Sequence, residues 1–215
     1  MQNKRSVSFN HKLALAGLSS LSLLLWGTPA LAHHPFGGDV PANAFEGFLS
    51  GLGHPVIGFD HLAFVITAGL LAVEFKRGLL IPVAFVATSL IGTPVHLLGV
   101  NLPAPEFLIS ASVLLFGVLL AKKNYLPVGA VAALAAAAGL FHGYAYGEVV
   151  VGAGMSPVLA YLAGFSTIQM GIAVGAYFVA KKLGANSEQK SLSMQFAGFT
   201  LAGIGTAFLS SVMLG

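Results

Sequence analysis

Residues 125–147 read YLPVGAVAALAAAAGLFHGYAYG and contain no Asp, Glu, Lys or Arg. A helix needs about 17–25 mainly apolar residues to cross the ~30 Å hydrocarbon core of a bilayer, and this run is long enough. Five further apolar runs flank it, at about 56–75, 78–99, 105–121, 155–180 and 192–214. The sequence therefore predicts an all-α membrane protein, a bundle of about six transmembrane helices in contact with lipid.

The composition points the same way. Hydrophobic residues make up 56% of the chain and charged residues only 8%, whereas a soluble domain carries about 25% charged residues. The 27 glycines suit membrane helices, because small residues let helix backbones approach closely. The formal charge of +3 does not indicate nucleic-acid binding, because the basic residues stand in isolated pairs without interleaved aromatics. The chain has no cysteine, which excludes thiolate metal sites and cysteine nucleophiles.

Residues 1–32 are predicted to be a cleavable secretory signal. An apolar segment at 13–25 follows three basic residues, Lys4, Arg5 and Lys12. Ala30 and Ala32 then supply the small side chains that signal peptidase requires at its cleavage site. The alternative is an uncleaved anchor helix. After cleavage, residues 33–215 would form a single transmembrane domain.

The positions of the basic residues predict the orientation. If the mature N-terminus lies outside the cell membrane, three connections between spans face the cytoplasm. Together with the signal they hold all ten basic residues of the chain, the connections contributing Lys76, Arg77, Lys122, Lys123, Lys181, Lys182 and Lys190. Cytoplasmic loops are enriched in Lys and Arg. We therefore expect a multi-pass protein of the bacterial inner membrane with its mature N-terminus in the periplasm.

Histidines and carboxylates gather on the opposite side in this orientation. The outer segments and the outer parts of the spans hold six histidines: His33, His34, His54, His61, His96 and His142. The same side holds five carboxylates: Asp39, Glu46, Asp60, Glu106 and Glu148. Because no Lys or Arg compensates them, this face should attract cations.

The densest group is HPVIGFDH, residues 54–61. On one continuous helix His54, Gly58 and His61 would share a face, with His54–Pro55 marking the helix start. Asp60 would point about 100° away, where it could ligate a cation or orient a histidine of another span. Because an aspartate at this depth costs about 2.5–3.5 kcal/mol on insertion scales, a functional role is the default interpretation. The alternative is that these side chains cap and pair helices near the interface.

Further candidate ligands lie on other segments. His96 and His142 sit toward the outer ends of two spans and could form a three-helix constellation with His61, although each alone could simply be a hydrogen-bonding partner between helices. Glu148 is either a ligand or a solvated loop acid. Tyr144 and Tyr146 could be interface aromatics.

The predicted mature terminus offers a different kind of site. After cleavage, the free α-amine, the His33 ring and His34 could chelate a divalent metal ion. The alternative is a mobile terminus that only raises the local concentration of cations.

Few polar residues lie deeper in the spans. The candidates for an inward path are Thr88, Ser89, Ser166, Thr167 and Gln169. Ser and Thr in membrane helices usually bond to their own backbone, which is the alternative for each of them singly.

Two motifs resemble a known family. The segment GLGHPVIGFDHLAF, residues 51–64, resembles the signature of the HupE/UreJ hydrogenase and urease accessory proteins, a family of membrane nickel or cobalt permeases. FHGYAYGE, residues 141–148, resembles the second histidine motif of that family, which often reads FHGHAHG. The resemblance implies that His54, Asp60 and His61 belong to a metal motif and that His142 is the first histidine of the second motif. The chain departs from the family at Tyr144 and Tyr146, where the family has two further histidines.

Taken with the resemblance, the sequence predicts a permease, not an enzyme, that takes up divalent nickel or cobalt for metalloenzyme or cofactor assembly. Nitrogen and oxygen donors without sulfur suit Ni²⁺ and Co²⁺, with Zn²⁺ as a less favoured substrate. Histidine ligands must be neutral, so capture should weaken as the pH falls through about 6.5, the ordinary pKa of histidine. The alternatives are a membrane metalloenzyme and a non-transporting metal sensor or assembly factor. The protein could form a homo-oligomer in any of these roles.

Overall fold

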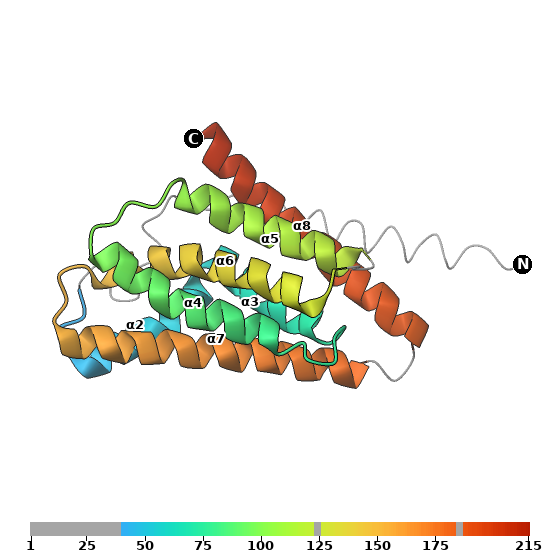
Figure 1. Cartoon of the computed structure of the whole chain (residues 1–215), viewed down its shortest axis with the longest axis horizontal. Helices are drawn as coiled ribbons and strands as arrows, with labels where there is room; N and C mark the ends of the chain where they lie inside the picture. The colour runs from blue at the N-terminus through green and yellow to red at the C-terminus, as the bar shows by residue number, and fades with distance from the viewer. Residues whose placement is uncertain (1–39, 123–125, 184–186) are drawn as a thin grey trace, which may run out of the picture. The chain divides into compact units, whose positions relative to one another are not determined.

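The structure is a computed structural model that describes residues 40–122, 126–183 and 187–215, with the side chains of 183–191 left aside. The predicted signal, His33 and His34 lie outside this part of the chain. The described residues belong to one compact unit and contain helices but no strand. The helices are α2 (Ala44–Ile57), α3 (Phe59–Ala72), α4 (Leu80–Leu97), α5 (Pro105–Ala121), α6 (Val128–Gly147), the 3₁₀ turn η2 (Glu148–Val150), α7 (Met155–Leu183) and α8 (Ser187–Leu214) (Figure 1).

The all-α membrane bundle predicted from the sequence is confirmed. Helices α4, α6, α7 and α8 are each long and apolar enough to cross a bilayer. Helices α2 and α3 pass the same test only as a pair, bent by 79° at their junction. Helix α5 is apolar but has 17 residues, the lower limit for a span. The protein is therefore a multi-pass membrane protein.

The expected helix start at His54–Pro55 is wrong. The chain is already helical from Ala44, where the Asn43 side chain accepts a hydrogen bond from the Glu46 backbone N–H at 3.0 Å. The helix ends at Ile57, and Gly58 adopts an extended conformation (φ −73°, ψ 98°). Pro55 lacks an N–H and weakens the last turn, and a Cβ on residue 58 would lie 2.6 Å from Cδ2 of His61. His54 and His61 therefore belong to two helices and do not share one helix face.

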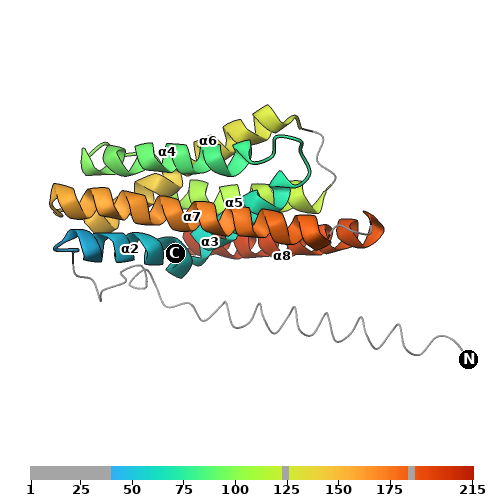
Figure 2. The same cartoon turned by 90° about the horizontal axis from the view of Figure 1, so that it is seen from below.

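Four helix pairs pack with their backbones close together: α2 with α7, α3 with α7, α4 with α6 and α5 with α8. Helix α3 also packs against α5. Figure 2 shows α4 and α6 together along one side of the bundle, with α7 beside α2. A Cβ on the glycines at these contacts would collide with the facing backbone, as at Gly51, Gly143 and Gly205. Small residues thus set the distances between the helices.

The described basic residues share one end of the bundle. The C-terminal ends of α3, α5 and α7 lie together at that end, on the right in Figure 1. These helix ends and the described residues that follow them carry Lys76, Arg77, Lys122, Lys181 and Lys182. The connections α4–α5 and α6–α7 lie at the other end. The order and direction of the helices therefore place the described basic residues at one end of the bundle, which agrees with the prediction that they face one side of the membrane.

Helix α8 offers a matched pair for testing the glycine contacts. A Cβ on Gly205 would collide with the backbone of Leu114 in α5, whereas a Cβ on Gly203 would meet nothing within 4 Å. We expect Gly205→Ala to lower the free energy of unfolding by about 1–3 kcal/mol, because α5 must move away. Gly203→Ala should leave it unchanged or raise it by up to about 1 kcal/mol, through helix propensity. Thermal unfolding in detergent measures both, and equal effects would contradict the packing.

Candidate functional site

Three histidines from three helices meet inside the bundle. His54 lies in the last turn of α2, His61 in the first turn of α3, and His142 five residues before the end of α6. Their exposed fractions are 3%, 3% and 0%. The ring centroids of His54 and His61 are 5.6 Å apart, and those of His61 and His142 are 4.9 Å apart. The bend at Gly58 brings the first two together, and α6 supplies the third.

A hydrogen-bonded chain fixes two of these rings. Nδ1 of His61 lies 2.8 Å from Nδ1 of His142. On the other side of the His142 ring, Nε2 lies 3.0 Å from Oγ of Ser112 in α5. The Ser112 hydroxyl donates to the Ile109 carbonyl at 2.6 Å. Both nitrogens of His142 therefore have protein partners.

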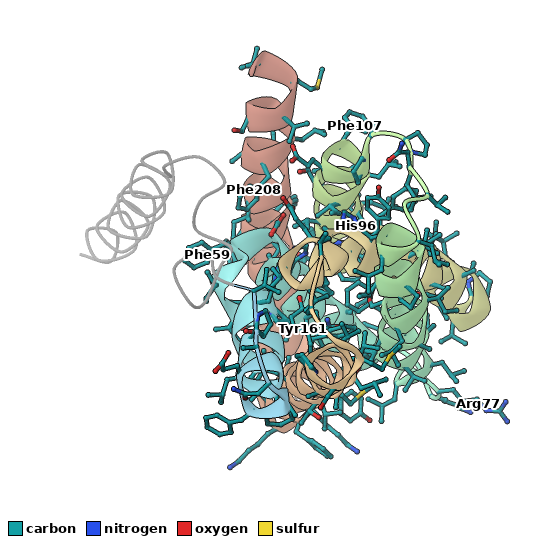
Figure 3. The ribbon with its side chains drawn as sticks, turned by 90° about the vertical axis from the view of Figure 1, so that its left-hand side faces the viewer. Phe59, Arg77, His96, Phe107, Tyr161 and Phe208 are labelled. Carbon is teal, nitrogen blue, oxygen red and sulfur yellow. The ribbon has the colours of Figure 1, made fainter. Side chains whose placement is uncertain are left out.

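The third ring is held from α7. The Tyr161 hydroxyl lies 3.0 Å from Nδ1 of His54 and donates to the carbonyl of Tyr146 at 2.9 Å. Figure 3 shows Tyr161 toward the middle of the bundle, whereas Phe59 points away from it. Tyr161 is fully buried. It links α2, α6 and α7 through one hydroxyl group.

Aromatic rings close the space around the histidines. The Tyr146 ring lies 4.6 Å from His61 and 5.0 Å from His54, centroid to centroid. It is fully buried, and its hydroxyl has no hydrogen-bond partner within the described residues. Phe64 and Phe85 pack on His142 at 4.9 and 5.2 Å. Tyr146 is thus part of the site and not an interface aromatic, so that expectation is wrong for this residue.

Asp60 lies at the edge of the histidine group. Its carboxylate accepts a hydrogen bond from the His61 backbone N–H at 2.8 Å, which satisfies one of the first N–H groups of α3. The same oxygen, Oδ1, lies 4.0 Å from Nε2 of His61, and the Asp60 side chain is 20% exposed. A charged oxygen ligand is therefore available beside the buried imidazoles.

The other predicted ligands in the described part of the chain are His96 and Glu148. His96 packs against Tyr144, with ring centroids 4.5 Å apart, and its Nδ1 is buried without a partner among the described residues. Its described ring contact is with that tyrosine and not with His61 or His142, so the expected constellation of His61, His96 and His142 forms only in part. Glu148 is exposed in η2.

The predicted path residues divide into two kinds. Four of them donate their hydroxyl hydrogen to a carbonyl of their own helix: Thr88, Ser89, Ser166 and Thr167. Gln169 differs, because it is fully buried and neither its Oε1 nor its Nε2 has a partner within the described part. An unpaired buried amide is costly, so Gln169 is the mid-span residue that most needs a functional explanation.

The three histidine rings do not form a complete metal-binding site in the arrangement described. Among the described side chains, no three His, Cys, Asp or Glu residues converge so as to hold a metal ion. His61 and His142 instead contact each other directly, which engages one nitrogen of each ring. Binding would require the carboxylate and imidazoles to move closer together around the ion.

The sequence reasoning missed Tyr161 and Ser112 and misjudged Tyr146. Tyr161 is a polar side chain inside an apolar span, and this signal alone could have singled it out. Ser112 had no such signal, because Ser110 stands two residues away in the same apolar run. Only the packing of α5 against α6 distinguishes the two serines.

The fold and the site together define a multi-pass helical membrane protein with a buried histidine group shared by α2, α3 and α6. The sequence pattern described as HupE / UreJ protein matches residues 21–208, and the chain belongs to this family. It is similar to Protein HupE of Rhizobium leguminosarum bv. viciae, with 32% identity over 139 residues, which is 64% of this chain and 69% of the relative. No solved structure matches the chain.

Two tyrosine variants test the geometry of the site. Tyr146→Phe removes a buried hydroxyl that has no partner among the described residues, so it should leave stability unchanged or raise it. Tyr161→Phe removes a hydroxyl with two partners, and we expect it to lower the free energy of unfolding by about 1–3 kcal/mol. Thermal unfolding of the purified proteins with a chelator present compares them. A larger loss for Tyr146→Phe than for Tyr161→Phe would contradict the hydrogen bonds described.

Proposed function

We propose that this chain is a permease that carries nickel or cobalt ions across the bacterial inner membrane into the cytoplasm, for metalloenzyme or cofactor assembly. The observation that supports this most directly is the group of His54, His61 and His142 buried inside a membrane bundle. Ionisable side chains in such a place are rare and usually mark a substrate path. Membership of the HupE / UreJ family agrees with a role in metal supply.

The direction of transport follows from the charges. The end of the bundle with the described basic residues is taken as cytoplasmic, by the positive-inside rule. The first residues of α2, the α4–α5 connection and η2 then face the periplasm, with Glu46, Glu106 and Glu148 near them. These carboxylates would concentrate divalent cations at the entrance.

The proposed ligands are the imidazoles of His54 and His61 and the carboxylate of Asp60. Nitrogen and oxygen donors of this kind suit Ni²⁺, Co²⁺ and Zn²⁺, and metal–ligand distances for such donors are about 2.0–2.2 Å. The 4.0 Å between Oδ1 of Asp60 and Nε2 of His61 spans nearly two such distances. A small rotation of the carboxylate would let one ion touch both atoms.

Passage inward would use the broken helix and Gln169. Many transporters bind their ions where a membrane helix is interrupted, because the interruption leaves backbone groups able to face the ion. The α2–α3 junction at Gly58 is such an interruption. Gln169, with no partner among the described residues for its amide, is the buried polar group on α7 that would receive the ion next.

Asp60 can be tested against a matched carboxylate. Asp60→Asn removes one negative charge and a strong oxygen ligand, and we expect it to lower nickel or cobalt uptake at least about tenfold. Glu106→Gln removes the same charge at the entrance, in the first turn of α5, where it only raises the local ion concentration, and should lower uptake by no more than about twofold. Uptake by vesicles containing purified protein, run across a panel of divalent ions, measures both. Normal uptake by correctly inserted Asp60→Asn would refute the ligand assignment.

Capture and passage should respond to different variants. His61→Ala should raise the half-saturating metal concentration at least as much as it lowers the maximal rate, because it removes a ligand of the capture site. Gln169→Leu should lower the maximal rate with little change in metal binding. Binding and flux measured on the same vesicle preparation separate the two. If His61→Ala keeps full binding while Gln169→Leu abolishes it, the selective site lies at Gln169 and not at the histidines.

A further inference from the structure

The hydrogen bonds around the histidines assign a tautomer to each ring. We infer from them that Ser112, His142 and Tyr161 are positioning residues, which hold His61 and His54 so that both present Nε2 to the metal ion. His142 then acts on the ion through His61 and is not itself a ligand. This inference rests on the proposed function for the identity of the ion, but the assignment of the tautomers rests on the geometry alone.

The argument begins at Ser112. A serine hydroxyl has one hydrogen, and the Ile109 carbonyl, 2.6 Å away, can only accept it. Ser112 must therefore be the acceptor in its 3.0 Å contact with Nε2 of His142. It follows that Nε2 of His142 carries a proton. In the neutral ring, Nδ1 of His142 then carries the lone pair.

The contact between His142 and His61 then determines which nitrogen of His61 carries the proton. Two ring nitrogens 2.8 Å apart need one hydrogen between them. Since Nδ1 of His142 is the acceptor, Nδ1 of His61 is the donor. Nε2 of His61 is then the unprotonated nitrogen, and it is the atom that lies 4.0 Å from Oδ1 of Asp60. The lone pair of His61 therefore lies on the nitrogen that is near the Asp60 carboxylate.

Tyr161 imposes the same tautomer on His54 independently. Its single hydroxyl hydrogen goes to the Tyr146 carbonyl at 2.9 Å. In the 3.0 Å contact with Nδ1 of His54, the tyrosine oxygen must therefore accept. His54 also carries its proton on Nδ1 and its lone pair on Nε2. Ser112 of α5 acts on His61 through His142 of α6, and Tyr161 of α7 acts on His54. Both contacts leave Nε2 as the unprotonated nitrogen of the ring.

The burial of His142 agrees with a positioning role. Its ring is fully buried between Phe64 and Phe85, and each of its nitrogens already has a protein partner. To ligate the ion through Nδ1, which carries its lone pair, it would have to give up its hydrogen bond with His61. Residues that orient a metal ligand in this way typically change metal affinity by about 10–100-fold when they are removed.

The tautomers can be read without any metal. Nitrogen-15 NMR of histidine-labelled protein with a chelator at about pH 8, above the ordinary pKa of histidine, distinguishes protonated Nδ1 from protonated Nε2. Single histidine variants assign the signals. We expect protonated Nδ1 at His54 and His61 and protonated Nε2 at His142. Protonated Nε2 at His61 or His54 would overturn the inference.

The role of His142 needs a second measurement. The side-chain oxygen of His142→Asn can accept from Nδ1 of His61, whereas His142→Ala cannot. We expect nickel binding within about threefold of the unaltered protein for Asn, and at least about tenfold weaker for Ala. X-ray absorption at the nickel edge counts the bound imidazoles. The count should not change in His142→Asn, and a loss of one imidazole would show that His142 is a ligand.

Ser112 has a matched control on its own helix. Ser110 is buried on α5 two residues away and is not among the described hydrogen-bond partners of His142. Ser112→Ala should weaken nickel binding about tenfold without changing the imidazole count, and Ser110→Ala should not weaken it. Equal effects of the two variants would overturn the positioning role. A protein that shows the expected tautomers but binds no divalent ion would refute the proposed function alone, because the tautomers do not depend on the metal.

Discussion

The interruption of the helix at Gly58 is the constraint on which the candidate site depends. Pro55 removes a backbone donor in the last turn of α2, and the absence of a side chain at Gly58 leaves room for the His61 ring. Had the helix continued, His54 and His61 would lie two turns apart, about 10 Å along the axis. The 79° bend instead brings their rings within 5.6 Å. The bend thus turns a sequence motif on two helices into one site.

Polar groups inside a bilayer must find hydrogen-bond partners within the protein. In this protein some of the buried polar side chains have such partners among the described residues and others do not. The three histidines are linked to Ser112 and Tyr161 by short hydrogen bonds. By contrast, the Tyr146 hydroxyl and the Gln169 amide lack partners within the described chain. In the proposed permease, the satisfied groups would hold the ligands in place, and the unsatisfied ones would have unused capacity to contact a cation. Both kinds are expected of a site that must bind an ion and then release it.

The sequence predicted the helical membrane class well, because lipid imposes a length and a composition that each run reveals by itself. It predicted about six spans, whereas four described helices, or five with the bent α2–α3 pair, are long and apolar enough to cross a bilayer. It also singled out His54, Asp60, His61 and His142, through their types and through the family motifs, and the structure brings these four side chains close together. It failed on α2 before His54, because Gly-rich residues such as those at 47–53 have no strong helical pattern. It could not find the bend or Ser112, because both depend on which helices pack together. Contacts between α5 and α6 are invisible in a single sequence.

The close glycine contacts suggest how binding could be coupled to movement. His54 sits on α2, which packs against α7 at Gly51 with its backbone in contact, and Tyr161 of α7 is also its hydrogen-bond partner. His61 sits on α3, beyond the bend. An ion bound by both His54 and His61 would therefore connect α2 to α3. The free energy of ion binding would then depend on the angle between these two helices. Because the rings are almost completely buried, a change in that angle or in the α2–α7 contact would widen the access of an ion to them. The hinge that creates the site is thus also the element through which access to it would be controlled.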